Sequence, residues 1–224
     1  TPRLTLAVGS DNRTATYTSG DNSTRFVYRY TIQSGDNDTN GISIGANALD
    51  NSSSTISDPA GNIPDNLTHS AVDNNSSYKV DTELPTLNSV AITGVQGDQN
   101  SFLNATDNVS VTATFSEAVI VASGTPTLTL AVGSDNRTAT YTSGDNSTEL
   151  VFRYTVQSGD NDSNGISIGA NALNSDNSTI SDPAGNIAIL THDEVDNNSS
   201  YKVDTVLPTL NSVGITSADG DQNS

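Results

Sequence analysis

The chain contains no cysteine, methionine or tryptophan, and it has only 8 basic residues against 26 acidic ones. Without cysteine, disulfides, thiolate metal sites and cysteine nucleophiles are excluded. The formal net charge of −18 repels phosphate backbones and anionic lipid, which argues against a nucleic-acid-binding or membrane-surface protein. No apolar run approaches the roughly 18 residues that a membrane span requires. We therefore expect no nucleic-acid partner and no membrane span in this segment.

Hydrophobic residues are also scarce, at 33% of the chain, but they follow a repeat. The segment Leu4–Thr24 recurs without a change as Leu128–Thr148, an offset of 124. The motifs SGDND, GISIGANAL, ISDPAGNI, VDNNSSYKVDT and LPTLNSV then recur in the same order, with the offset falling to 123 after one residue is dropped. A period of about 123 residues is too long for a solenoid repeat and corresponds to a whole small domain.

The repeat divides the chain into one complete module and two partial ones. The seam is the motif VDT-x-LPTL, whose proline imposes an extended backbone between modules. Residues 83–205 form the complete module, residues 1–82 match only its later two thirds, and residues 206–224 match the first strand of a further module. Below, residues 1–82 are called the first copy and residues 83–205 the second copy.

Apolar and polar residues alternate with a period of two, as in half-buried strands, and Gly-, Asp- and Asn-rich turns separate the runs. We expect about seven strands per module and no helix. This pattern predicts an all-β fold of tandem immunoglobulin-like β-sandwich modules. The residues that we expect to be buried in the complete module are Val111, Phe115, Leu130, Phe152 and Tyr154.

An ordered series of short motifs resembles a known family. The series TFSEAV, TPTLTL, ATYTSG, VQSGDN, ISDPAGN and YKVDT-x-LPT resembles the bacterial immunoglobulin-like repeats of very large surface proteins, and within them the SWM-type repeat of cell-surface proteins and RTX-like adhesins. The resemblance covers the full chain, although each motif alone is weak. It implies an extracellular or cell-surface, multi-copy, non-enzymatic module that serves as a stalk or adhesive extender.

Calcium is the one cofactor for which the residues argue. Hard cations take carboxylate, amide and backbone oxygens, which Asn- and Asp-rich loops supply. Tracing the strands places Asp81, Glu117 and Asp182 at the same end of the complete module. The facing SGDND loop adds Asp36 and Asp38, and the next junction offers Asp204 with Asp160 and Asp162. The alternative is that these aspartates form turns by capping their own backbones.

Sequons for N-glycosylation are about twice as frequent as composition alone would give. They begin at Asn12, Asn22, Asn37, Asn51, Asn66, Asn74, Asn75, Asn104, Asn108, Asn136, Asn146, Asn161, Asn177, Asn197 and Asn198. Many lie in NST and NSS turns. Glycans on turn tips are therefore a possible partner if the chain is secreted, and duplication and turn preference are the competing explanation.

Catalysis has little support in the sequence. His69 and His192 occur once per copy at equivalent loop positions, without a serine elbow or metal-ligand spacing around them. We expect both rings to be exposed loop side chains, and we predict that the chain is not an enzyme.

Two functions of different kinds remain. The first is a structural repeat of a long extracellular fibre, surface coat or adhesin stalk, rigidified by calcium. The alternative is a ligand- or glycan-binding adhesive module, which we rank lower because the copies are so alike.

Neighbouring modules of the same chain are the expected partners. The first copy has no counterpart of residues 88–124, which include two predicted strands. We expect upstream sequence of a longer array to supply them. The other possibility is a head-to-tail, strand-exchanged filament, in which Leu207–Thr216 inserts into the open module of the next subunit.

Overall fold

The computed structural model describes residues 1–215, and its regular elements are all β-strands. The lack of helix in this described part confirms the all-β prediction. The chain forms two compact units. Unit 1 consists of Thr1–Pro85 together with Glu117–Ile120 and Ile180–Ile189, and unit 2 contains the remaining described residues. Unit 1 thus combines the first copy with three short segments of the second, residues 83–85, 117–120 and 180–189.

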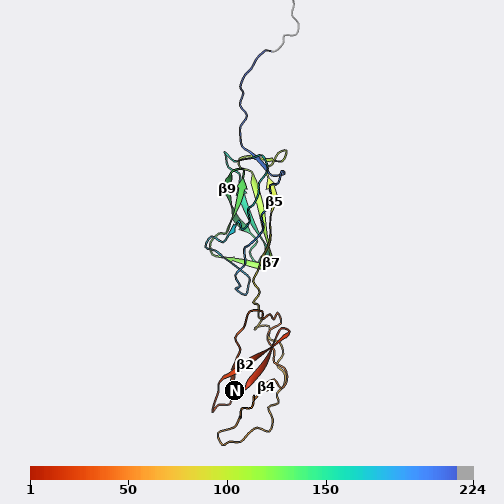
Figure 1. The fold of residues 1–224 in the computed structure, drawn as a ribbon, viewed down its shortest axis with the longest axis vertical. Coiled ribbons are helices and arrows are strands. Elements are labelled where there is room, and N and C mark those ends of the chain that lie inside the picture. Colours follow the sequence, from red (N-terminus) through yellow and green to blue (C-terminus); the bar gives the residue numbers. More distant parts are fainter. Residues whose placement is uncertain (216–224) are drawn as a thin grey trace, which may run out of the picture. The chain divides into compact units, whose positions relative to one another are not determined.

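The first copy forms a four-stranded antiparallel sheet in the order β3-β2-β1-β4 (Figure 1). Its strands are β1 (Arg3–Val8), β2 (Asp11–Ser19), β3 (Val27–Arg29) and β4 (Leu49–Asp50). Only β2 pairs with β3, so β3 is an edge strand of this sheet. An edge strand presents backbone N–H and C=O groups that are free to pair with a further strand.

The second copy contains the two longest strands among the described residues, β5 and β7, both labelled in Figure 1. A seven-stranded sheet has the order β12-β8-β9-β10-β7-β13, and β5 pairs with β7 alone. A three-stranded sheet has the order β11-β14-β6, with β14 parallel to β6. The bounds are β5 (Leu87–Gln96), β6 (Phe102–Leu103), β7 (Asn108–Ala122), β8 (Thr127–Val132), β9 (Asp135–Ser143), β10 (Ser147–Thr155), β11 (Asn161–Asp162), β12 (Leu173–Asn174), β13 (Thr179–Ser181) and β14 (Lys202–Asp204).

The identical sequence segments form identical hairpins. Val8 lies opposite Asp11 at the end of β1–β2, as Val132 lies opposite Asp135 at the end of β8–β9. The turn residue Gly133 has a φ of +61°, and a Cβ on it would lie 2.1 Å from the carbonyl oxygen of Asn161. Only glycine fits there, because any side chain would meet backbone.

The core of the second copy confirms the predicted buried residues. Val111, Phe115, Leu130, Phe152 and Tyr154 are all buried. They belong to β7, β8 and β10, in which buried residues alternate with more exposed ones. The alternation of apolar and polar residues in the sequence therefore correctly identifies the buried face of each strand.

The same positions are more exposed in the first copy. Phe26 is 36% exposed, whereas its counterpart Leu150 is fully buried. Ile32 is 41% exposed, whereas its counterpart Val156 is 2% exposed. In the second copy β10 has β7 as its neighbour, and the first copy contains no segment of that sequence. The difference in burial follows from the strand that covers one copy only.

The segment after the second copy forms no strand up to Ile215. Its apolar residues Leu210 and Val213 are exposed, whereas their counterparts Leu87 and Val90 in β5 are buried. The rest of the predicted further module, Thr216–Ser224, lies outside the described residues.

Candidate functional site

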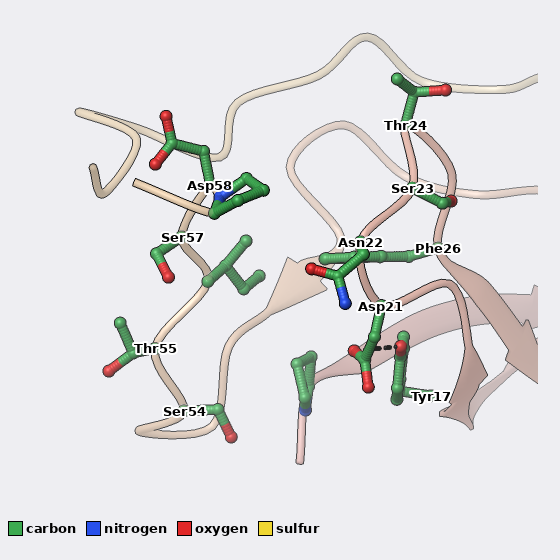
Figure 2. Close-up of a pocket in the computed structure, with 13 residues that line it drawn as sticks. Tyr17, Asp21, Asn22, Ser23, Thr24, Phe26, Ser54, Thr55, Ser57 and Asp58 are labelled. Atoms are coloured by element: carbon green, nitrogen blue, oxygen red, sulfur yellow. Dashed lines mark hydrogen bonds between the residues drawn. The ribbon is translucent and has the colours of Figure 1, made fainter. Parts of the chain in front are cut away.

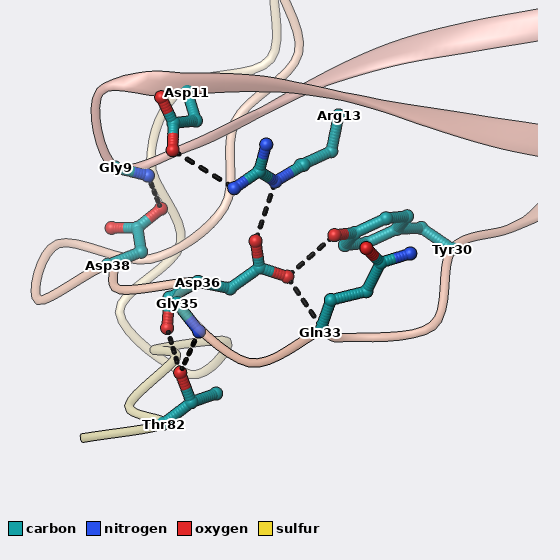
Figure 3. Close-up of polar contacts among 9 residues, drawn as sticks. All are labelled: Gly9, Asp11, Arg13, Tyr30, Gln33, Gly35, Asp36, Asp38 and Thr82. Carbon is teal, nitrogen blue, oxygen red and sulfur yellow. Dashed lines mark hydrogen bonds and ion pairs between the residues drawn. The ribbon is translucent and has the colours of Figure 1, made fainter.

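A buried carboxylate of the first copy, that of Asp36, is held by three donors (Figure 3). The Tyr30 hydroxyl donates to Asp36 Oδ2 at 2.6 Å, and the Gln33 backbone N–H donates to the same oxygen at 2.8 Å. Arg13 Nε donates to Asp36 Oδ1 at 2.6 Å, which makes an ion pair. The three donors come from β2 and from the loop after β3, so Asp36 fastens this loop to the hairpin.

The second copy repeats this arrangement around Asp160. Tyr154 and the Gln157 N–H donate to Oδ2, the latter at 2.9 Å, and Arg137 Nε donates to Oδ1 at 2.6 Å. Arg137 also contacts Asp135 at 3.1 Å. We call each set of tyrosine, aspartate and arginine a Tyr–Asp–Arg cluster.

The donors decide the protonation of these acids. Burial alone would raise the pKa of Asp160, but the hydrogen bonds from Tyr154 and Gln157 and the charge of Arg137 outweigh it and lower that pKa. In the first copy the Tyr30 hydroxyl is the main cause of the lowered pKa of Asp36. Burial and the bond to Asp160 raise the pKa of Tyr154 to about 12. Both carboxylates are therefore charged and are already paired with an arginine.

Two further predicted ligands, Asp38 and Asp162, cap the backbone of their own turns. Asp38 Oδ2 accepts from Gly9 N at 2.8 Å, and its Oδ1 accepts from the N–H groups of Asn40 and Gly41 at 3.0 and 2.7 Å. The hydrogen bond from the Gly9 N–H is the main cause of the lowered pKa of Asp38. Asp162 makes the same three contacts in the second copy. This is the turn-forming role that we weighed against metal binding.

Three of the predicted ligands do converge. One carboxylate oxygen from each of Asp81, Glu117 and Asp182 lies within 4.8 Å of the other two. Asp182 is buried, Glu117 is half-buried and Asp81 is exposed. All three belong to unit 1, although they come from parts of the chain far apart in sequence. We call them the acidic cluster.

The acidic cluster carries unbalanced negative charge. Burial raises the pKa of Glu117, and the nearby charges of Asp81, Asp182 and Glu83 raise it further. Asp182 is positioned by Asn186, whose backbone N–H and side-chain amide donate to its two oxygens at 2.8 and 2.7 Å. None of the ion pairs between described residues includes a member of the cluster.

The remaining predicted ligand, Asp204, is not a member of the acidic cluster. It ends β14 opposite Asn161, is exposed, and accepts a hydrogen bond from Val206 N at 2.9 Å. Of the eight predicted ligands, three therefore gather in one place. Asp36, Asp38, Asp160 and Asp162 instead receive their hydrogen bonds from their own copies.

The expectation of exposed histidines is wrong for His192, which is buried. Its Nε2 accepts from Ala172 N at 2.8 Å, so the proton resides on Nδ1, which donates to the Asp193 carbonyl at 2.6 Å. His69 makes the matching bonds to Ala48 and Ser70 at 2.9 and 2.8 Å. Each ring joins two loops of its own copy, and both of its nitrogens are occupied by backbone.

Comparison with known proteins identifies no relative of this chain. No family model matches the sequence, and neither a curated protein nor a solved structure is detectably similar to it. Within the described residues the structure has no helix long and apolar enough to cross a membrane.

Proposed function

We propose that the chain is a structural repeat of a long extracellular fibre, surface coat or adhesin stalk, built from immunoglobulin-like β-sandwich modules in series. The observation that carries this proposal is that the two copies share the same structural contacts between loops and strands. What is repeated is not a set of reactive side chains. Both copies have the same hairpin register and the same Tyr–Asp–Arg cluster. Both also have a histidine whose ring accepts a hydrogen bond from the backbone of another loop. Each of these features fastens loops to strands within a copy.

The sandwich interpretation is supported by the burial of alternate residues on several strands. β7, β8 and β10 each bury one face, and β11, β14 and β6 form a second, small sheet in the same copy. Two sheets with apolar inner faces pack against each other in sandwich folds. The high negative charge is consistent with a surface that stays soluble and resists self-association.

The experiment that tests this function is a length series. Proteins with one, two and four copies of residues 83–205 in tandem are made, and their dimensions are measured by small-angle scattering and electron microscopy. A spacer gives a constant increase in contour length for each added copy. Collapse into particles whose length does not grow with copy number would contradict the proposal. Antibodies against this segment should also label the outside of intact cells that produce it.

Calcium is part of this proposal, at the acidic cluster. Three carboxylates with no cationic partner offer the hard oxygen ligands that calcium prefers. A bound cation would relieve the repulsion that raises the pKa of Glu117. It would also fasten the segment around Asp81 to β7 and to the loop of Asp182, which would stiffen unit 1.

A further inference from the structure

Thr82, the last residue of the motif VDT in the first copy, is bonded to the loop that carries the motif SGDND (Figure 3). Its hydroxyl accepts a hydrogen bond from the Gly35 N–H at 2.9 Å and donates one to the Asp36 carbonyl oxygen at 3.0 Å. One side chain therefore ties the chain to two neighbouring peptide groups of this loop, at the point where the chain leaves the copy towards Pro85.

Thr205 makes the same two bonds in the second copy. Its hydroxyl accepts from the Gly159 N–H at 2.9 Å and donates to the Asp160 carbonyl oxygen at 3.0 Å. The Thr205 N–H also donates to Asn161 Oδ1, at 3.4 Å. Thr205 directly follows β14, a strand of only three residues that pairs with β11 and β6. We call Thr82 and Thr205 the exit threonines.

The loop that each exit threonine contacts is itself fastened to longer strands. Asp160 offers its carbonyl oxygen to Thr205, and its buried carboxylate belongs to the Tyr–Asp–Arg cluster. That carboxylate accepts from Tyr154 in β10 and is ion-paired with Arg137 in β9. A force on Thr205 is therefore transmitted through Asp160 to two strands of nine residues, in addition to the three-residue strand β14.

Not every bond between a tyrosine and an aspartate is repeated in this way. Figure 2 shows another one in the first copy, in which the Tyr17 hydroxyl donates to Asp21 at 2.6 Å. In the second copy the counterpart of Asp21 is Asp145, which accepts instead from the Val121 backbone N–H at 2.8 Å. The contacts of the exit threonines and their loops, in contrast, are the same in both copies.

We propose that each exit threonine and its SGDND loop form a mechanical latch, which lets the copy carry tension along the chain. A force that pulls on the chain after Thr205 meets the latch before it meets the backbone pairs of β14. The latch therefore slows the first step of unfolding, and the unfolding rate governs how a protein yields to force. This inference rests on the proposed function, because only copies joined in series are loaded through their exits. It also gives one role to two of the recurring motifs, SGDND and VDT.

The test is single-molecule force spectroscopy on the full 224-residue chain, held through cysteines added at its two ends. Because the chain has no cysteine of its own, these attachments are unique. The second copy is recognised by its larger gain in contour length, since it contains more residues than the first. Thr205→Val removes the hydroxyl and keeps the shape of the side chain, so both latch bonds are lost. At a fixed force we expect the second copy of this variant to unfold about tenfold faster. Thr205→Ser keeps the hydroxyl and should unfold at the wild-type rate.

Thr142→Val is the matched control. The Thr142 hydroxyl donates to the Val151 carbonyl oxygen at 3.0 Å, a bond of the same kind, but one that joins β9 to β10. Because this bond is still formed when the latch breaks, the unfolding rate under force should stay within about twofold of that of wild type. Circular dichroism checks that all variants are folded before they are pulled.

A second pulling direction separates a latch from an ordinary stabilising contact. With the attachments at Asp98→Cys and Thr148→Cys, the loaded segment excludes both Thr205 and the loop that it contacts. In this direction Thr205→Val should change the unfolding rate by less than about twofold. Equal acceleration in the two directions would overturn the proposal, as would an unchanged rate for Thr205→Val pulled from the ends. A Thr205→Ser variant as fast as Thr205→Val, or an equal effect of Thr142→Val, would overturn it too.

The latch and the spacer function fail separately. Copies that add length in the length series but yield to force equally with and without the Thr205 hydroxyl would be spacers without a latch. Copies that do not add length would contradict the spacer function, whatever force the second copy withstands.

Discussion

The Tyr154 hydroxyl donates a hydrogen bond to the buried carboxylate of Asp160, six residues further along the chain. The same pair occurs in the first copy as Tyr30 and Asp36. Tyr154 lies near the end of β10 and Asp160 directly before β11, so the bond spans the loop between these two strands. The arginine from the neighbouring strand adds an ion pair to the same carboxylate.

Removing the tyrosine hydroxyl should lower the free energy of unfolding in both copies, and by more for Tyr154 than for Tyr30. Tyr154→Phe takes a hydrogen bond from a buried, charged acceptor, which is worth about 1.5–3 kcal/mol of unfolding free energy. Tyr30→Phe should cost less, because Tyr30 is partly exposed. Urea denaturation monitored by circular dichroism measures both.

The control for these variants is Tyr28→Phe. The Tyr28 hydroxyl is buried and has no hydrogen-bond partner among the described residues. Its removal should leave stability unchanged or slightly raised, because an unsatisfied polar group is costly to bury. A loss for Tyr28→Phe as large as that for Tyr154→Phe would mean that ring packing, and not the bond to Asp160, determines the effect.

Acid should destabilise the protein through the Tyr–Asp–Arg clusters. The pKa of Asp160 and that of Asp36 are lowered from the ordinary value of 3.8. The stabilisation by each charged form is present above pH 3.8 and is lost as the pH falls through the lower, folded-state pKa. Asp160→Asn should be less stable at neutral pH and should lose less on acidification. Melting temperatures between pH 2 and 7 test this; parallel curves for the two proteins would contradict it.

The acidic cluster should respond to pH with the opposite sign. The pKa of Glu117 is raised above its ordinary value of 4.5, so its ionised form destabilises the fold. In chelator, this penalty is relieved as the pH falls from the raised pKa towards 4.5. Glu117→Gln in chelator at neutral pH should therefore gain up to about 1 kcal/mol.

Calcium should reverse the effect of that substitution. Extracellular modules bind calcium with dissociation constants of about 10⁻⁴–10⁻³ M, and saturation at 100 times the constant adds about 2.7 kcal/mol. Wild type should gain this stability on addition of calcium, and Glu117→Gln should gain much less. If wild-type melting curves in calcium and in chelator superimpose, the metal proposal fails.

Glycine at the hairpin turn should be irreplaceable. Gly133→Ala places a Cβ 2.1 Å from the Asn161 carbonyl oxygen, in addition to the roughly 1–2 kcal/mol cost of a left-handed alanine. We expect a loss well above that backbone cost. Gly169→Ala is the matched control, because a Cβ there meets nothing within 4 Å and its φ is not in the left-handed region. It should be close to neutral in the same denaturation assay.

A pair of leucines measures how much the covering strand contributes. Leu130 is fully buried and Leu6, its counterpart, is only half-buried. Leu130→Ala should cost about 2–5 kcal/mol, the range for buried leucine, and Leu6→Ala clearly less. Equal losses in chemical denaturation would show that the first copy is packed as tightly as the second.

The sequence predicted the all-β fold and the buried faces because strand periodicity is a local property. Val111, Leu130 and Phe152 were all identified from alternation alone. The contrast between Phe26 and Leu150 was not predicted residue by residue, since it depends on a strand from elsewhere in the chain. The burial of His192 was missed for a similar reason, because its partners are backbone groups of other loops.

The candidate site was predicted in part. The convergence of Asp81, Glu117 and Asp182 follows from counting strands up and down, whereas the roles of Asp36 and Asp160 depend on arginines that the sequence did not single out. Arg13 lies in a segment that is identical in both copies, so repetition gives it no special weight. A better signal was available in the strand beside it: Tyr28 is replaced by Phe152, but Tyr30 is retained as Tyr154.

The β1–β2 and β8–β9 hairpins differ only at Arg3 and Thr127, and this near-identity has a consequence for folding kinetics. Since their sequences otherwise match, either hairpin could pair with β10 during folding, and the main difference between them is the length of the intervening chain. Each doubling of a loop costs about 0.6 kcal/mol, so a connection roughly fortyfold longer costs about 3 kcal/mol. That is a small margin against misassembly, which is a characteristic failure of repeat proteins. During synthesis the first hairpin emerges and folds before β10 exists, whereas refolding from denaturant makes both hairpins compete for β10 at once.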